Sequence, residues 1–286
     1  MLSILLIQNI LGYYGSSSIK RSLGMIAHLS QHGIRKCNTV INKINTMKTA
    51  YLNLRYTVPE RREAFTKGLE CLGYKVKHKL PVTTDNGDIF VTWNRIGLAN
   101  DIANDYQSKG LPVLVTENSA WGNDLAGSHW YAIARNYHNT AGCFNIGGTE
   151  RWDDLGVELQ PFKSKEGIII LPQRGIGSAP TVMPANWTAK AHAKYGGLIR
   201  YHPGRAKNPV PLEDDLNKYG TAITWGSGAS VKALMMGLHV KSDMPNWIAE
   251  QDNTEQGRLD MFRRLAWAQW RMGEIQNGIA FAWLLS

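Results

Sequence analysis

Cysteine is scarce in this chain: only Cys37, Cys71 and Cys143 occur among 286 residues. They lie too far apart to suggest a disulfide framework or a zinc site, so we expect a reducing, cytoplasmic setting. Long apolar runs are missing as well. No stretch approaches the roughly 20 residues that a helix needs to span a bilayer, and we therefore expect no transmembrane segment.

Acidic residues are absent from residues 1–46, whereas basic residues are present there. The basic residues are Lys20, Arg21, Arg35, Lys36 and Lys43. They carry five of the nine net positive charges of the chain, which leaves +4 for the remainder. So mild an excess suits phosphate-bearing ligands and supports contact with nucleic acid or a membrane surface only weakly.

The segment 1–46 also differs from the rest in its pattern. Its apolar start is interrupted by Gln8 and Asn9 and has no basic residue before it, which argues against a secretory signal. The lack of acids suits a transit peptide better. Because Met47 comes directly before a strand-like apolar segment, we interpret residues 1–46 as an N-terminal extension, either disordered or produced by a mis-assigned start.

From Met47 onward, short apolar segments alternate with helical ones, which predicts an α/β fold with mostly parallel sheets covered on both faces. The first half, residues 47–164, has expected strands at 49–56, 74–78, 88–93, 112–116 and 130–134, and expected helices at 59–73 and 98–109. The second half, residues 165–286, has expected strands at 167–172, 198–201 and 221–225, and expected helices at 185–195, 212–219, 230–236 and 255–270. Each half is Rossmann-like.

A glycine and serine turn lies between the expected strand at 221–225 and the helix that follows. Gly226, Ser227 and Gly228 let a ligand approach the backbone, and the helix start offers N–H groups to a phosphate. Ser230 adds a hydroxyl and Lys232 adds a positive charge. An ordinary N-cap serine in a tight turn is the alternative, but the carboxyl end of a parallel strand favours a ligand site.

Arg200 and His202 also follow an expected strand, so we predict that they lie at the same sheet edge as the serine turn. A guanidinium suits bidentate contact with phosphate, and an imidazole can donate a hydrogen bond to a phosphate or ribose oxygen. An isolated histidine before proline would be read as a turn residue. The convergence of the two segments favours a binding role.

A third segment, residues 173–178, contains Arg174, Gly175 and Ser178. It matches only part of a dinucleotide fingerprint, because Pro180 falls where the third glycine is expected. We predict that Arg174 and Ser178 lie near a pyrophosphate in a loop between the two halves. A structural glycine turn is an equal alternative.

Three segments in order carry a resemblance to a known family: RYHP at 200–203, ITWGSGASVKALMMG at 223–237 and LAWAQW at 265–270. Together they resemble GT-B glycosyltransferases with an HP motif and a serine motif. Such enzymes include capsular-polysaccharide transferases and small bacteriophage enzymes that modify hydroxymethylated DNA bases. The resemblance implies two Rossmann-like domains facing across a cleft, with His202, Ser227 and Ser230 holding a nucleotide-sugar co-substrate and no other cofactor.

In such an enzyme the acceptor hydroxyl loses its proton to a base that usually comes from the N-terminal half. Asp124 and Glu117, which follow an expected strand, are the candidates, with His129 close behind them. Each is also compatible with a solvated loop acid or a helix N-cap. Trp121 and Trp130 suit stacking on a sugar or a flipped base, or packing in the core.

Metal dependence is not expected, because the Asp-x-Asp motif of the GT-A class is missing from the sequence. The acids at residues 213–215 are better explained as the first turn of a helix. Charge on the leaving group would instead be stabilised by Arg200, Arg174, Lys232 and the helix N-terminus.

The sequence thus predicts a metal-independent transferase that moves a sugar from a nucleotide donor to a hydroxyl acceptor. Basicity and small size favour a hydroxymethylated base in phage DNA, in the cytoplasm of a bacterial host. One alternative is a polysaccharide or teichoic-type polymer transferase, and another is a non-catalytic nucleotide-binding module. The donor nucleotide and the oligomeric state stay open at this point.

Overall fold

A computed structural model describes residues 48–54, 58–85, 87–137, 142–175, 181–203 and 210–286. The predicted N-terminal extension, residues 1–46, lies outside the described residues. Met47–Ser286 makes up one unit of the chain, and within it the described strands form two sheets. Each sheet has helices on both faces.

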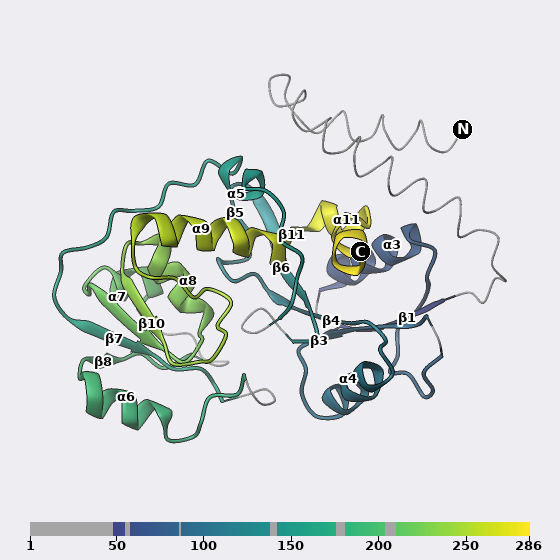
Figure 1. The fold of residues 1–286 in the computed structure, drawn as a ribbon, viewed down its shortest axis with the longest axis horizontal. Helices are drawn as coiled ribbons and strands as arrows, with labels where there is room; N and C mark the ends of the chain where they lie inside the picture. The colour runs from purple at the N-terminus through teal and green to yellow at the C-terminus, as the bar shows by residue number, and fades with distance from the viewer. Residues whose placement is uncertain (1–47, 55–57, 86, 138–141, 176–180, 204–209) are drawn as a thin grey trace. The chain divides into compact units, whose positions relative to one another are not determined.

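The first sheet has seven described strands in the order β11-β6-β4-β3-β1-β2, with β5 paired to β6 (Figure 1). Its four parallel strands are β1 (Thr49–Asn53), β2 (Lys75–Lys77), β3 (Ile89–Trp93) and β4 (Val113–Asn118). The antiparallel strands are β5 (Asp124–Leu125), β6 (Ser128–Arg135) and β11 (Gln269–Arg271). The sheet is therefore mixed, with its parallel part built as the sequence predicts.

Two helices connect the parallel strands, and a glycine follows two residues after the end of each. The helix α3 (Pro59–Cys71) begins with proline in its first turn, where no backbone N–H is needed. The helix α4 (Leu98–Ser108) covers the opposite face of the sheet. Gly73 and Gly110 follow the two helices with φ of 83° and 68°, a left-handed conformation that favours glycine.

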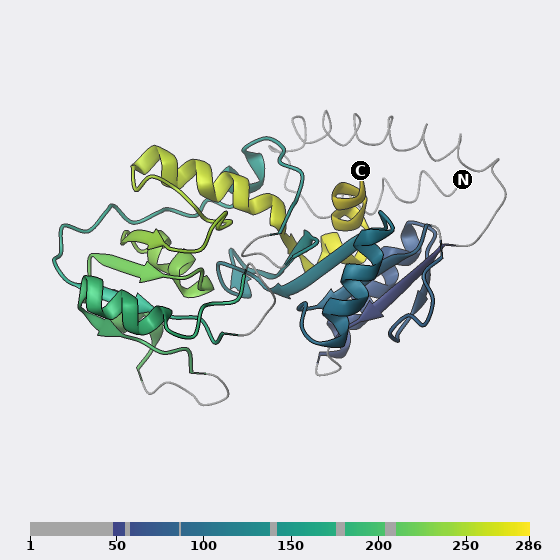
Figure 2. The same cartoon turned by 60° about the horizontal axis from the view of Figure 1, so that its bottom comes forward.

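The second sheet is parallel throughout, in the order β10-β9-β7-β8. Its strands are β7 (Ile168–Leu171), β8 (Leu198–Ile199), β9 (Thr221–Thr224) and β10 (His239–Ser242). Its helices are α6 (Trp187–Tyr195), α7 (Leu212–Leu216), α8 (Gly228–Met235) and α9 (Glu255–Leu265). Alternate strand residues pack against α6 on one face and against α8 and α9 on the other (Figure 2).

Trp121 and Trp130 pack in the core, which is the second of the two alternatives for these residues. Both are buried, and their rings meet edge to face at 5.3 Å between centroids. Trp152, on the short helix α5 (Glu150–Asp153), contacts Trp121 and stacks on Phe262 of α9 at 4.5 Å. This cluster joins the loop after β4 to the helices of the second sheet.

The helix expected at residues 255–270 was predicted too long. It ends at Leu265, a short 3-10 turn follows (Ala266–Ala268), and the chain then enters β11, where Trp270 pairs with Tyr131 of β6. The apolar residues after Leu265 keep a helical spacing, but hydrogen bonding to β6 prevails over that local preference.

Residues 269–286 thus complete the first sheet and its helical cover. The helix α10 (Met272–Gln276) packs on α3, where a Cβ on Gly68 would lie 1.9 Å from the Ile275 carbonyl oxygen. In α11 (Ile279–Leu285), Phe281 meets Phe65 of α3 edge to face at 5.6 Å. The domain boundary between residues 164 and 165 stays a prediction.

Candidate functional site

The loops after β7, β8 and β9 lie at one edge of the second sheet, because these strands are parallel neighbours. They carry Arg174, His202 and the turn at Gly226, respectively. A hydrogen bond joins two of the loops: Gln173 Nε2 donates to the Gly226 carbonyl at 2.8 Å. This bond joins the first and third loops, whereas the convergence predicted from the sequence, between the Arg200–His202 segment and the serine turn, stays a prediction.

Thr224 holds the serine turn in place, a role that the sequence analysis missed. Its buried hydroxyl accepts hydrogen bonds from the N–H groups of Gly226 at 3.1 Å and Ser227 at 2.9 Å. The same hydroxyl donates to the Leu171 carbonyl of β7 at 2.9 Å. A threonine as the last strand residue before a glycine turn is a recognisable signal for such a bond.

The two serines of the turn make hydrogen bonds within it. Ser227 is the N-cap of α8, and its Oγ accepts from the Ala229 N–H at 3.3 Å. Ser230 is fully buried, and its hydroxyl donates to the Ser227 carbonyl. Ser230 thus supports the backbone from inside. The N–H groups of Ala229 and Ser230 both bond to Ser227, which leaves the Gly228 N–H as the first-turn donor that points out of the helix end.

Arg200 is held in a buried ion pair with Asp215, a partner that the sequence analysis did not foresee. The two side chains are only 9% and 11% exposed. Arg200 Nη2 also donates to the Val210 carbonyl at 2.8 Å, and Lys218 Nζ lies 2.9 Å from Asp215 Oδ1. The contacts with Lys218 and Arg200 lower the pKa of Asp215. Arg200 therefore positions the β8 loop through internal bonds.

Arg174 and His202 are both exposed at this edge. Partial burial of the imidazole, together with the positive charge of Arg174, lowers the pKa of His202 below its usual value. Because the charge of Arg174 acts on the His202 imidazole, the loops after β7 and β8 lie near each other. Gly175 has φ of 66°, which its lack of a side chain permits. Ser178 lies outside the described residues.

Lys232 lies four residues after Gly228 in α8, and its role in a phosphate site stays a prediction. It occupies the last turn of the helix, and its Nζ lies 3.4 Å from Glu213 Oε1. The helical rise separates it from the serine turn, since each residue advances the chain by about 1.5 Å. The nearer cations at this edge are Arg174 and, when protonated, His202.

At the carboxyl end of β4, the predicted base candidates Asp124 and His129 form a pair. His129 Nδ1 lies 2.9 Å from Asp124 Oδ1, across the hairpin that joins β5 to β6. Ala126 and Gly127 both have positive φ, as a two-residue hairpin turn of this type requires. Asp124 is 84% exposed and His129 is 37% exposed, so both are accessible to an acceptor.

Glu117, the other candidate, lies on β4 opposite Ala132 of β6 and is partly buried. The loop that follows β4 approaches the second sheet. The Ala120 N–H donates to Gln269 Oε1 at 2.9 Å, and the Ala120 carbonyl oxygen lies 3.9 Å from where a Cβ on Gly228 would be. The loop leading to Asp124 therefore meets the first turn of α8.

A buried arginine behind His129 was also missed by the sequence analysis. Arg61 of α3 has its guanidinium carbon 3.9 Å from the centre of the Trp93 ring and 5.6 Å from that of Tyr131. The Tyr131 ring in turn meets the His129 imidazole edge to face at 5.0 Å. Burial raises the pKa of Tyr131, so its phenol stays protonated. These side chains form a rigid support for the hairpin pair.

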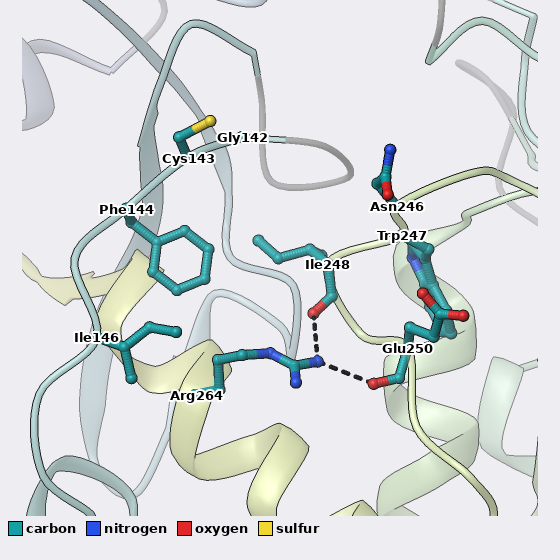
Figure 3. Close-up of a pocket in the computed structure, with 9 residues that line it drawn as sticks. All are labelled: Gly142, Cys143, Phe144, Ile146, Asn246, Trp247, Ile248, Glu250 and Arg264. Atoms are coloured by element: carbon teal, nitrogen blue, oxygen red, sulfur yellow. Dashed lines mark hydrogen bonds between the residues drawn. The ribbon is translucent and has the colours of Figure 1, made fainter.

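Two surface pockets, of about 420 and about 410 Å³, lie away from these residues. Figure 3 shows the residues that line the first: Gly142, Cys143, Phe144, Ile146, Asn246, Trp247, Ile248, Glu250 and Arg264. The second lies on α3 near His78. Within the described ranges, no three His, Cys, Asp or Glu side chains gather as a metal site, and no helix is long and apolar enough to cross a membrane.

No protein-family model and no curated protein matches the sequence. Among solved structures, KpsC of Thermosulfurimonas dismutans, a beta Kdo 2,4 transferase, aligns with 82% of this chain and 99% of its own, at 13% identity and a TM-score of 0.50. The beta Kdo 2,7 transferase of the same KpsC aligns over the same shares at 9% identity and a TM-score of 0.47. Aspartate transcarbamoylase from Trypanosoma cruzi reaches a TM-score of only 0.25 at 13% identity, with 84% of this chain and 87% of its own covered. The first match shows that the chain has a glycosyltransferase-like α/β fold.

Proposed function

We propose that the protein transfers a sugar from a nucleotide-sugar donor to a hydroxyl group of an acceptor. The observation that carries this proposal is the approach of the Ala120 carbonyl to Gly228. This approach places the loop that leads to the exposed Asp124–His129 pair next to the start of α8, which is suited to a phosphate. A glycosyl transfer needs both: a base for the acceptor and a positive electrostatic environment for the leaving nucleotide.

The donor phosphates are proposed to bind at the first turn of α8. The Gly228 N–H and the helix dipole favour a negative charge there, and Thr224 fixes the turn that precedes this N–H. Arg174 and His202 extend from the adjacent loops and supply further donors. No metal is required by this arrangement, since charge on the departing nucleotide is balanced by these groups.

His129 is proposed as the base, with Asp124 as its orienting partner. Asp124 accepts the Nδ1–H, which leaves Nε2 free to take the proton of the acceptor hydroxyl. The acceptor oxygen then bonds to the anomeric carbon, and the bond between that carbon and the phosphate oxygen breaks. The nucleotide leaves with the electron pair. This assignment makes Asp124 a supporting group and leaves Glu117 as the alternative base.

For the acceptor we favour a polysaccharide over a hydroxymethylated DNA base. KpsC, the structural neighbour, is a Kdo transferase, which supports a glycan acceptor by analogy of fold. The mild net charge of the chain beyond residue 46 gives a DNA strand little electrostatic attraction.

A thermal-shift panel of UDP-, GDP-, CMP- and CDP-sugars tests the donor site, because a ligand that binds the folded state raises its melting temperature. One nucleotide class is expected to raise it, and His202→Ala is expected to abolish the rise. His192→Ala, an exposed histidine on α6, serves as the control. If no nucleotide sugar shifts the melting temperature, the donor site is rejected. If a donor binds but no acceptor hydroxyl is glycosylated, a non-catalytic nucleotide-binding module remains.

A further inference from the structure

The pocket of about 420 Å³ is separate from every residue assigned to transfer so far. Figure 3 shows Phe144 and Ile146 on one side, with Asn246 and Glu250 on the other. The Ile248 side chain points between them, toward Phe144. With Trp247 also in its lining, the pocket combines two aromatic and two aliphatic side chains with a planar amide and a carboxylate.

Arg264 at the floor of the pocket fixes one of its walls. Its Nη2 donates to the carbonyl oxygens of Ile248 at 3.2 Å and Glu250 at 2.8 Å (Figure 3). These bonds hold the segment 246–250 in place without using the Glu250 carboxylate. The wall is thus preformed, which lowers the entropic cost of ligand binding.

The charges of the pocket exclude some ligands and favour others. Arg264 and Glu250 cancel, and part of the guanidinium is already bonded to carbonyl oxygens, so a polyanion such as DNA gains little here. A neutral sugar fits better. Its C–H face packs on an aromatic ring, and its hydroxyl groups both donate and accept, as the Asn246 amide and the Glu250 carboxylate require.

The position of the pocket sets which part of an acceptor it would hold. Cys143, on its rim, pairs with Arg135 through backbone hydrogen bonds of 2.7 and 3.0 Å. Arg135 and His129 lie at opposite ends of β6. Six residues of strand separate them by about 20 Å, at 3.3 Å per residue. A sugar in the pocket is therefore too far from His129 to react.

We infer that this pocket is a glycan subsite that holds a neutral sugar unit of an extended acceptor chain, remote from the unit that is glycosylated. The inference rests on the proposed function and makes it more specific: the acceptor is a polysaccharide, and its affinity grows with chain length. A short acceptor reaches His129 alone, whereas a long one reaches both places.

Two variants probe the pocket with little risk to the fold. Phe144→Leu keeps an apolar side chain but removes the flat ring. Glu250→Ala removes the carboxylate but leaves the backbone carbonyl that accepts from Arg264. Val82→Ala, at a side chain that is 89% exposed, is the matched control. Melting curves of all variants establish that each is folded.

Binding is measured on an array of bacterial surface polysaccharides, and then with the disaccharide and octasaccharide of whichever polysaccharide binds. Both pocket variants are expected to weaken octasaccharide binding by about tenfold, since a lost ring contact or hydrogen bond is worth about a factor of ten in affinity. In both pocket variants, the affinity for the disaccharide and the thermal shift caused by donor sugars are expected to stay unchanged. In Val82→Ala, octasaccharide affinity, disaccharide affinity and thermal shift are all expected to match wild type.

The inference is overturned if the wild-type protein binds no glycan, if both variants bind the octasaccharide as wild type does, or if binding to hydroxymethylated DNA is what the variants lose. Failure of the proposed function has a different signature. In that case no nucleotide sugar shifts the melting temperature, while octasaccharide binding still depends on Phe144 and Glu250.

Discussion

The imidazole of His129 and the carboxylate of Asp124 face each other across a two-residue turn, with 2.9 Å between Nδ1 and Oδ1. The edge of the Tyr131 ring supports the imidazole from behind. Because both partners of the pair are fixed by strand register and still exposed, an acceptor hydroxyl can reach Nε2 without any rearrangement of the hairpin. The pair is the first part of the site to test.

Asp124→Asn is expected to lower kcat by about a hundredfold or more, because an amide in place of the carboxylate no longer fixes the Nδ1–H tautomer. The measurement is the initial rate of transfer at saturating donor and acceptor. Glu117→Gln serves as the comparison, with a change of less than about threefold expected. The opposite ranking of the two variants would assign the base to Glu117.

The pKa of His202 is expected to rise in Arg174→Gln, since the variant removes the neighbouring positive charge that helps to lower it. An NMR titration of the imidazole measures this directly. In the wild-type protein the imidazole is neutral at pH 7, and donor phosphates bind its protonated form better. Donor affinity should therefore increase as the pH falls below the usual value of 6.5. An unchanged titration in Arg174→Gln would show that burial alone causes the shift.

Protonation of His202 also affects the free energy of unfolding. It is expected to strengthen donor binding but to weaken the folded state. The folded protein binds this proton more weakly than the unfolded chain does, so protonation favours unfolding. The contribution of His202 to stability should decline as the pH drops from about 7 toward the lowered pKa. Chemical denaturation of wild type and His202→Gln across this pH range measures the difference, which should stop changing with pH once the pH is well above 6.5.

Asp215→Asn is expected to lower the free energy of unfolding by about 3 kcal/mol at pH 7, because it leaves the buried Arg200 guanidinium without its counter-ion. The pKa of Asp215 is lowered in the folded state, so the carboxylate stabilises the protein above its usual pKa of 3.8. This stabilisation is lost as the pH falls through the lowered value. Urea denaturation at several pH values should show the wild-type advantage shrinking in acid; an advantage that does not depend on pH would exclude ionisation as its source.

Phe281→Ala is expected to cost about 3 to 5 kcal/mol of stability, since the ring is fully buried against Phe65. Urea denaturation followed by circular dichroism measures the loss. Ile279→Ala, at an exposed position of the same helix, should change the stability by no more than about 0.5 kcal/mol. Equal effects of the two substitutions would show that α11 does not contribute to the core of the first sheet.

Local signals in the sequence were enough to predict most elements of the fold. Pro59 marks the start of α3, and Gly73 and Gly110 follow the ends of α3 and α4, because each of these residues has a strong backbone preference of its own. Short apolar runs likewise predict the buried parallel strands, because apolar side chains favour burial. The serine turn was predicted at the end of β9, where it also accepts a hydrogen bond from Gln173 of the β7 loop.

Contacts between residues distant in sequence were not predictable in this way. Arg200 matched a phosphate ligand by type, but its ion pair with Asp215 depends on how α7 packs beside β8. The ion pair of Lys232 with Glu213 likewise depends on how α7 and α8 pack, which the sequence does not reveal. Residues 266–270 continue a helical pattern, and pairing with the edge of β6 explains why the chain forms a strand at Gln269–Arg271.

The pairing of β11 with β6 also has a consequence for synthesis on the ribosome. The first sheet cannot be completed until residues 269–285 have emerged, although its other strands are made long before. Until then, the edge of β6 and the apolar face of α3 lack their partners and are open to pairing with other chains. The second sheet, whose last strand ends at Ser242, can therefore close during synthesis before the first sheet does.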